Sequence, residues 1–249
     1  MDILPDLSVG GWLIVVVCGV LVGFTKTGVA GLGLVIVPLL AMVFEPHRSP
    51  GVLLPMLCMA DVLAVIYYHR HAVWAHVLRP MPWAVAGIVV TFVVLKCIPL
   101  RGATYGRLIG AVVLICIGIG LVRSRRGGKE KHGALFAAAV GVLGGFATMA
   151  ANAAGPIWVV YLLAMGLPKY ELIGTGAWFF FALNLLKVPF QANLGNITGS
   201  TLALNGLLLP AILAGGWLGI RTVRRMDQRL FNRVIQALAA AGAVKLILS

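Results

Sequence analysis

Long apolar stretches separated by short polar loops dominate the chain, and they predict its class. Each of the eight stretches is long enough for a helix to cross the roughly 30 Å hydrocarbon core of a bilayer. Two of them are too long for a single crossing. The stretches cover residues 10–42, 51–68, 80–98, 104–122, 133–167, 170–190, 201–220 and 230–248.

The composition agrees with this pattern. Hydrophobic residues make up 61% of the 249 residues and charged residues 11%, which is too apolar for a soluble domain whose surface must carry charge. We therefore expect an all-α polytopic membrane protein in the lipid bilayer. The first eight residues carry two acids and no basic residue, so no cleaved signal peptide is expected. The four cysteines are expected to be core residues without disulfide or metal roles.

Membrane topology explains the net charge of +13 better than a nucleic-acid partner does. Lysines and arginines gather at residues 123–131 and 221–233, and such loops face the cytoplasm under the positive-inside rule. With both loops inside, thirteen lysines and arginines lie on the cytoplasmic side and four on the outer side. The sequence thus predicts a multi-pass protein of the inner or plasma membrane that binds no nucleic acid.

An internal repeat divides the chain at a spacing of 123 residues. Residues 38–42 and 161–165 share Leu-Leu-Ala-Met, and Asp61 corresponds to Asn184. If the stretch 133–167 crosses the membrane an even number of times, the basic loop at 221–233 lies inside and the two halves have opposite orientation. A single long helix there would give parallel halves but would place that loop outside, against the charge rule.

We therefore predict two inverted-topology repeats, residues 1–122 and 133–249, joined by a basic cytoplasmic linker at 123–132. Each repeat has a broken-helix hairpin followed by three transmembrane helices. This gives 8 spans if the hairpins are re-entrant and 10 if they cross fully. The oligomeric state is left open, with a homodimer as one alternative.

Each of the two longest stretches contains a predicted helix break. The first is interrupted by Gly28, Gly31, Gly33 and Pro38, and the second by Asn152, Gly155 and Pro156. Backbone inside a membrane must be hydrogen-bonded or line a cavity, so both breaks predict a polar interior. The amino end of a half-helix carries unpaired N–H groups and about half a positive charge, which can hold an anion. Two such ends from inverted halves would face one central site.

Polar residues in and beside the breaks are the candidate substrate-binding residues. Lys26 lies between Thr25 and Thr27, where a cation and two hydroxyls can bind oxyanion oxygens; the alternative is a lysine that snorkels to the headgroups. In the second break the candidates are Thr148 and Asn152; the alternative is that they form a turn and do not contact a ligand. The full predicted set is Thr25, Lys26, Thr27, Gly28, Gly31, Thr148, Asn152, Gly155, Asn184 and Lys187.

Asp61 is the predicted proton-coupling residue. It lies in the middle of an apolar stretch, where an ionised carboxylate costs roughly 2.5 to 3.5 kcal/mol on insertion scales unless it is paired, hydrated or protonated. Three roles are open from the sequence. Asp61 can pair with Lys187 across the repeat axis, carry a proton, or form a structural hydrogen bond between helices.

No enzyme activity and no cofactor or metal site is expected. The chain has no Walker A motif, no paired carboxylates and no Ser/His/Asp set. His69, His71 and His76 flank a loop, but no cysteine or acid stands near them to complete a metal site. Four aromatic residues can contact either the membrane interface or the bundle, namely Trp74, Trp83, Trp158 and Tyr161.

Residues 23–40, their degenerate second copy at 152–163, and the mid-span Asp61 and Asn184 resemble the TauE/SafE sulfite exporter family, also called the 4-toluene sulfonate uptake permeases (TSUP). The resemblance covers the whole chain. It implies a transporter of sulfite, sulfoacetate or another organosulfonate that uses a proton gradient. The chain departs from the commoner family pattern in Thr-Lys-Thr at 25–27 and Asn-Ala-Ala-Gly-Pro at 152–156, which leaves the choice of substrate open.

These patterns together predict a secondary transporter of a small sulfur oxyanion or organosulfonate, coupled to protons, with alternating access around a central site between the repeats. A passive anion channel of the same architecture is the alternative. A membrane enzyme or an assembly subunit is a third interpretation, which the missing catalytic constellation disfavours. The expected partners are a small anionic substrate, protons and the lipid bilayer.

Overall fold

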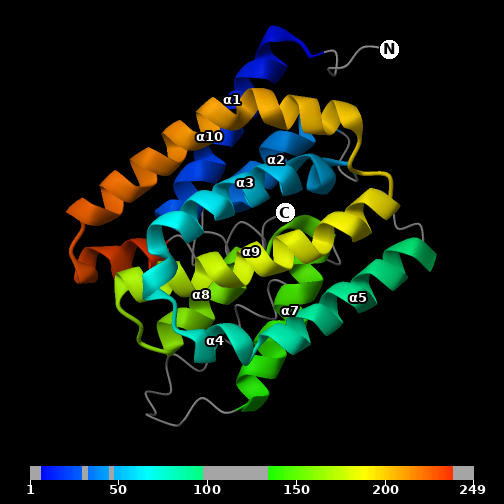
Figure 1. The fold of residues 1–249 in the computed structure, drawn as a ribbon. Coiled ribbons are helices and arrows are strands. Elements are labelled where there is room, and N and C mark those ends of the chain that lie inside the picture. The colour runs from blue at the N-terminus through cyan, green and yellow to red at the C-terminus, as the bar shows by residue number, and fades with distance from the viewer. Residues whose placement is uncertain (1–6, 30–32, 45–47, 98–133, 238–249) are drawn as a thin grey trace.

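The computed structural model describes residues 7–29, 33–44, 48–97 and 134–237, and these residues form helices joined by short loops (Figure 1). The predicted span at 104–122, the linker at 123–132 and Gly31 lie outside the described residues. Residues 228–237 are also helical. The other helices are α1 Val9–Thr27, α2 Gly33–Ala41, α3 Ser49–Tyr68, the 3-10 turn η1 His69–His71, α4 Trp74–Leu78, α5 Met81–Cys97, α7 Ala134–Ala151, α8 Gly155–Ala164, α9 Lys169–Asn193 and α10 Gly199–Arg225.

Six helical segments of the described part are long and apolar enough to cross a membrane. The chain is therefore a multi-pass membrane protein, as its composition predicts. Helices α2 and α8 have 9 and 10 residues. At 1.5 Å per residue each covers about half of the roughly 30 Å hydrocarbon core. Both long apolar stretches are broken, as predicted, since α1 ends before Gly28 and α7 ends before Asn152. Pro38 does not interrupt the first stretch as expected, because it lies inside α2.

The two broken stretches fold back on themselves as hairpins. A Cβ added to Gly11, near the start of α1, would lie 3.6 Å from Val43, just past the end of α2. In the second hairpin the ring of Phe136, near the start of α7, lies 5.7 Å from that of Tyr161, near the end of α8. Each short helix thus returns toward the end of the bundle where its long partner began.

The helices of the two halves match at the spacing of 123 residues. Helix α1 corresponds to α7, α2 to α8, α3 to α9 and α5 to α10. Helix α1 packs along α10 and α5 packs along α7, so corresponding helices make corresponding contacts across the halves. Between these layers α3 packs against its own counterpart α9 (Figure 1).

Helices α3 and α9 run antiparallel. The ring of Tyr68, at the end of α3, lies 6.2 Å from that of Tyr170, at the start of α9. At the other end, a Cβ added to Gly51 would lie 2.3 Å from the carbonyl oxygen of Asn196, just past α9. The middle of the pair is where Asp61 and Asn184 meet.

Glycine permits the closest approaches between the two halves. A Cβ on Gly215 of α10 would lie 1.9 Å from the carbonyl oxygen of Val20 of α1, so no other residue fits there without separating the helices. In the α5–α7 layer, a Cβ on Gly145 would lie 2.1 Å from the carbonyl oxygen of Ala84. Such close backbone contacts are a common way to pack helices in lipid, where no hydrophobic force joins them.

Candidate functional site

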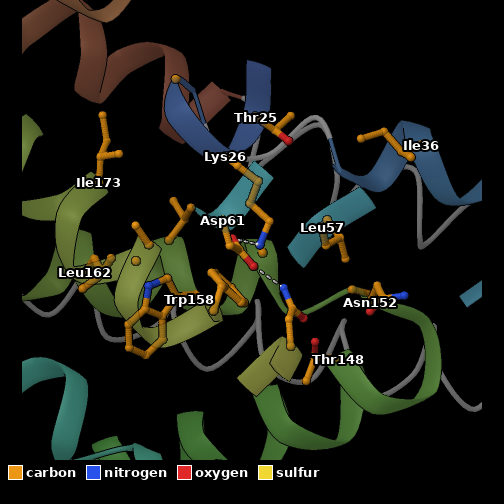
Figure 2. A pocket seen from close by; sticks show the side chains of 18 of the residues that line it. Thr25, Lys26, Ile36, Leu57, Asp61, Thr148, Asn152, Trp158, Leu162 and Ile173 are labelled. Carbon is orange, nitrogen blue, oxygen red and sulfur yellow. Dashed lines mark hydrogen bonds and ion pairs between the residues drawn. The ribbon is translucent and has the colours of Figure 1, made fainter. Parts of the chain in front are cut away.

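A cavity of about 100 Å³ lies where the two helix breaks, α3 and α9 come together (Figure 2). A single water needs roughly 10–15 Å³ by a comparable measure, so the cavity can hold a small ion or several waters. Most of its wall is apolar and includes Leu57, Leu162 and Ile173. Its polar side chains are Thr25, Lys26, Asp61, Thr148, Asn152, Trp158 and Asn184.

An ion pair between Lys26 and Asp61 occupies one side of the cavity. The Lys26 Nζ atom lies 2.7 Å from Asp61 Oδ1. The Asp61 side chain is fully buried, and the Lys26 side chain is 14% exposed. The same ammonium lies 4.4 Å above the centre of the Phe180 ring. Lys26 is in the last turn of α1, and its side chain turns into the bundle. The snorkelling alternative therefore does not hold.

Asp61 also joins the two halves of the chain. Asn184 Nδ2 of α9 donates a hydrogen bond of 2.5 Å to Asp61 Oδ2 of α3. These two residues correspond at the 123-residue spacing, so the bond connects equivalent positions. Asp61 thus forms the interhelical hydrogen bond that was one of its three alternatives. Its charge partner is Lys26.

Lys187 does not pair with Asp61, contrary to another of those alternatives. Its fully buried ammonium donates to the carbonyl oxygen and hydroxyl of Thr148, at 3.2 and 2.8 Å, and to Asn152 Oδ1 at 2.6 Å. Lys187 lies almost one turn beyond Asn184 on α9, and it faces the break between α7 and α8. It therefore stabilises that break and does not line the cavity.

Asn152 forms the corner of the second break. Its φ of 53° is in the left-handed region, which asparagine tolerates better than most residues with a side chain. Its amide Nδ2 donates to the carbonyl oxygen of Pro50 at 3.0 Å, while its Oδ1 accepts from Lys187. Helix α8 then starts at Gly155, which lines the cavity. The amino end of α8 thus borders the cavity, an arrangement that favours negative charge.

Comparison with known proteins places this geometry in a family. The model of the sulfite exporter TauE/SafE family matches residues 15–246. The chain belongs to the sulfite exporter TauE/SafE family. This confirms the resemblance of its motifs and indicates membrane transport of sulfite or a related small anion. No curated protein and no solved structure matches the chain.

The matched part of this TauE/SafE protein contains both helix breaks and the whole polar lining of the cavity. Most of the predicted site residues meet there. Of the predicted site residues that the structure describes, two do not line the cavity, namely Thr27 and Lys187. The Thr27 hydroxyl is buried at 2.7 Å from the carbonyl oxygen of Gly216, which makes it a contact between α1 and α10. The predicted residues that line the cavity are Thr25, Lys26, Gly28, Asp61, Thr148, Asn152, Gly155 and Asn184.

Two aromatic residues that were not among the predicted site residues also line the cavity, Trp158 and Phe180. Trp158 is 3% exposed and is a bundle contact, whereas Trp74 and Trp83 are about half exposed. The only available signal for Trp158 was its place three residues after Gly155, in the first turn of the half-helix. For Phe180 the sequence gives no signal, because it stands in a run of three phenylalanines.

Proposed function

We propose that the protein is a secondary transporter that moves a small sulfur oxyanion or organosulfonate through the central cavity by alternating access between two inverted repeats. The observation that carries this proposal is the buried Lys26–Asp61 pair, which borders the cavity and is bonded across the two halves to Asn184. A buried charge inside a membrane bundle is costly and usually marks an ion or substrate pathway.

The antiparallel arrangement of α3 and α9 supports inverted repeats. Two corresponding helices related by an axis along the membrane normal would run parallel, whereas an axis in the membrane plane makes them antiparallel. The two hairpins support the same topology, since each returns to the end of the bundle where it began. The repeats are residues 1–122 and 133–249, and the linker at 123–132 lies in the cytoplasm with the arginines at the end of α10.

The anion binds beside Lys26, which is the one cation that lines the cavity in the described part of the chain. The Lys26 ammonium and the amino end of α8 both provide positive potential at the cavity. The surrounding apolar wall favours a ligand with a small organic group over a strongly hydrated inorganic ion.

Proton coupling follows from competition for Lys26. The Lys26 charge is balanced by the Asp61 carboxylate, so an incoming anion must compete with that carboxylate. A proton on Asp61 removes the competing charge and leaves Lys26 to bind the anion. Proton and anion are therefore carried in the same direction, and the two gradients together set whether transport is inward or outward.

Flux measurements in proteoliposomes test this function. With the outside made acidic, we expect uptake of labelled sulfite and of methanesulfonate, whose charge is constant over the range used, to exceed equilibrium. Lys26→Ala should abolish uptake, and Asp61→Asn should leave anion exchange but remove its dependence on the pH gradient. Flux that only dissipates an anion gradient and ignores the pH gradient would instead identify a passive channel.

A further inference from the structure

The indole N–H of Trp158 is a buried hydrogen-bond donor without a partner. The side chain is 3% exposed, and its Nε1 atom has no acceptor among the described residues. Buried donors in native proteins are almost always satisfied, so each exception calls for an explanation. Trp158 lines the central cavity together with Lys26 and Asp61 (Figure 2).

The surroundings hold this donor in place. The Trp158 ring stacks on Phe179 with centroids 3.6 Å apart and an interplanar angle of 5°, and the Tyr161 ring lies 5.2 Å away. Gly176 of α9 faces the indole nitrogen, and a Cβ added there would lie 3.3 Å from Nε1. The glycine thus places no side chain against the buried N–H, while the stacked ring cannot turn to find another acceptor.

We propose that the Trp158 N–H donates a hydrogen bond to an oxygen of the sulfite or sulfonate group held in the cavity. This inference rests on the proposed function and adds a specificity-determining residue to it. A sulfur oxyanion presents several acceptor oxygens, so one oxygen can face Lys26 while another accepts from the indole. The fixed direction of the N–H favours such an anion over a spherical ion such as chloride.

The indole differs from Lys26 in one important respect. It carries no charge and cannot be neutralised by Asp61, so it can bind the anion whether or not Asp61 holds a proton. Because it belongs to α8, it also connects the anion to the second repeat, whereas Lys26 and Asp61 both belong to the first. An anion bound between them joins the two repeats.

Calorimetric titration of the purified full chain with sodium sulfite and with sodium methanesulfonate tests the inference. Trp158→Phe retains an aromatic ring but loses the donor, and we expect a dissociation constant about 10- to 100-fold higher, as for a lost hydrogen bond to a charged group. Trp178→Phe is the matched control. Its indole nitrogen is also buried and unpartnered, but Trp178 does not line the cavity, so its dissociation constant should match that of the unsubstituted protein.

A second variant keeps the test decisive if Trp158→Phe does not fold. Gly176→Ala leaves the tryptophan in place and puts a methyl group over its N–H, so it should weaken binding of both anions in the same direction. Unchanged binding in the folded variants overturns the role of Trp158 and leaves the proposed function standing. Absence of binding by the unsubstituted protein overturns the proposed function, and this inference with it.

Discussion

The buried ion pair predicts strong energetic coupling between Lys26 and Asp61, which a double-mutant cycle measures. Lys26→Met leaves a fully buried carboxylate whose remaining hydrogen-bond partner in the described structure is Asn184. Removing one partner of a buried pair costs about 3–5 kcal/mol, because the other charge loses its compensation. We expect that loss of stability for Lys26→Met.

Asp61→Asn should cost less, about 1–3 kcal/mol. Two features reduce the cost. Lys26 is 14% exposed, so water in the cavity solvates part of its charge, and an asparagine oxygen can still accept from its ammonium. Asn184 can also rotate its amide, since its Oδ1 is buried without a hydrogen-bond partner among the described residues and can then accept from the new amide nitrogen.

The double variant removes both charges together. Replacing a buried pair by neutral groups is often nearly neutral in stability, so we expect a total cost of about 2–3 kcal/mol for the lost hydrogen bonds. The single changes sum to about 4–8 kcal/mol, so the double variant falls below that sum by at least about 1 kcal/mol, more than the roughly 0.5 kcal/mol within which independent sites add. Anion binding should be lost all the same, because Lys26 is gone.

Reversible unfolding in mixed detergent micelles, followed by circular dichroism, gives the four free energies. Thr91→Val combined with Lys26→Met is the control cycle, because the Thr91 hydroxyl bonds to the carbonyl of Gly87 in its own helix and Thr91 does not line the cavity. The control should be additive within about 0.5 kcal/mol. If the effects of the Lys26 and Asp61 changes add as closely as those of the control pair, the ion pair between Lys26 and Asp61 is refuted.

Two further predictions concern the backbone and use the same unfolding assay. Gly215→Ala should destabilise the protein by about 1–3 kcal/mol, since its methyl group would meet the α1 backbone. The control is Gly206→Ala on the same helix, whose methyl group meets nothing within 4 Å and which should be neutral or slightly stabilising. Equal effects of the two changes would contradict the close α1–α10 contact. Asn152→Ala should lower the free energy of unfolding by about 1–2 kcal/mol more than Asn152→Gly does. Both variants lose the same hydrogen bonds, but only glycine adopts a φ of 53° without strain. Equal losses would count against the left-handed corner.

Sequence patterns were sufficient for the helices and their breaks. Length and hydropathy located every described helix that is long enough to cross the membrane. Gly28 and Asn152 located the ends of α1 and α7 within a residue. These features depend on local backbone chemistry, which a residue and its neighbours determine. The correspondence of Asp61 and Asn184 also came from the sequence, because a repeat fixes which positions are equivalent.

The partner of Asp61 could not be obtained in the same way. The sequence suggested Lys187 as a possible charge partner, whereas the partner in the structure is Lys26. Which lysine reaches Asp61 depends on how α1 and α9 are rotated about their axes, which side-chain packing sets. Lys187 turns to the α7–α8 break, where three oxygen acceptors satisfy it without a carboxylate. Trp158 was ambiguous for the same reason, since a tryptophan near a helix end suits both a membrane interface and a bundle core.

The two halves of the chain differ in the residues that they place at the cavity, and this difference limits how many protons the site can couple to each anion. The first half of the chain supplies Asp61 and Lys26, while the second half has Asn184 and Met149 at the positions 123 residues later. Two aspartates at equivalent positions on the α3–α9 contact would repel each other, whereas one aspartate and one asparagine form the observed hydrogen bond. Among the described residues that line the cavity, Asp61 is the one acid. Under the proposed mechanism this site therefore couples at most one proton to each anion. A measured ratio of two would require a second carboxylate outside this cavity.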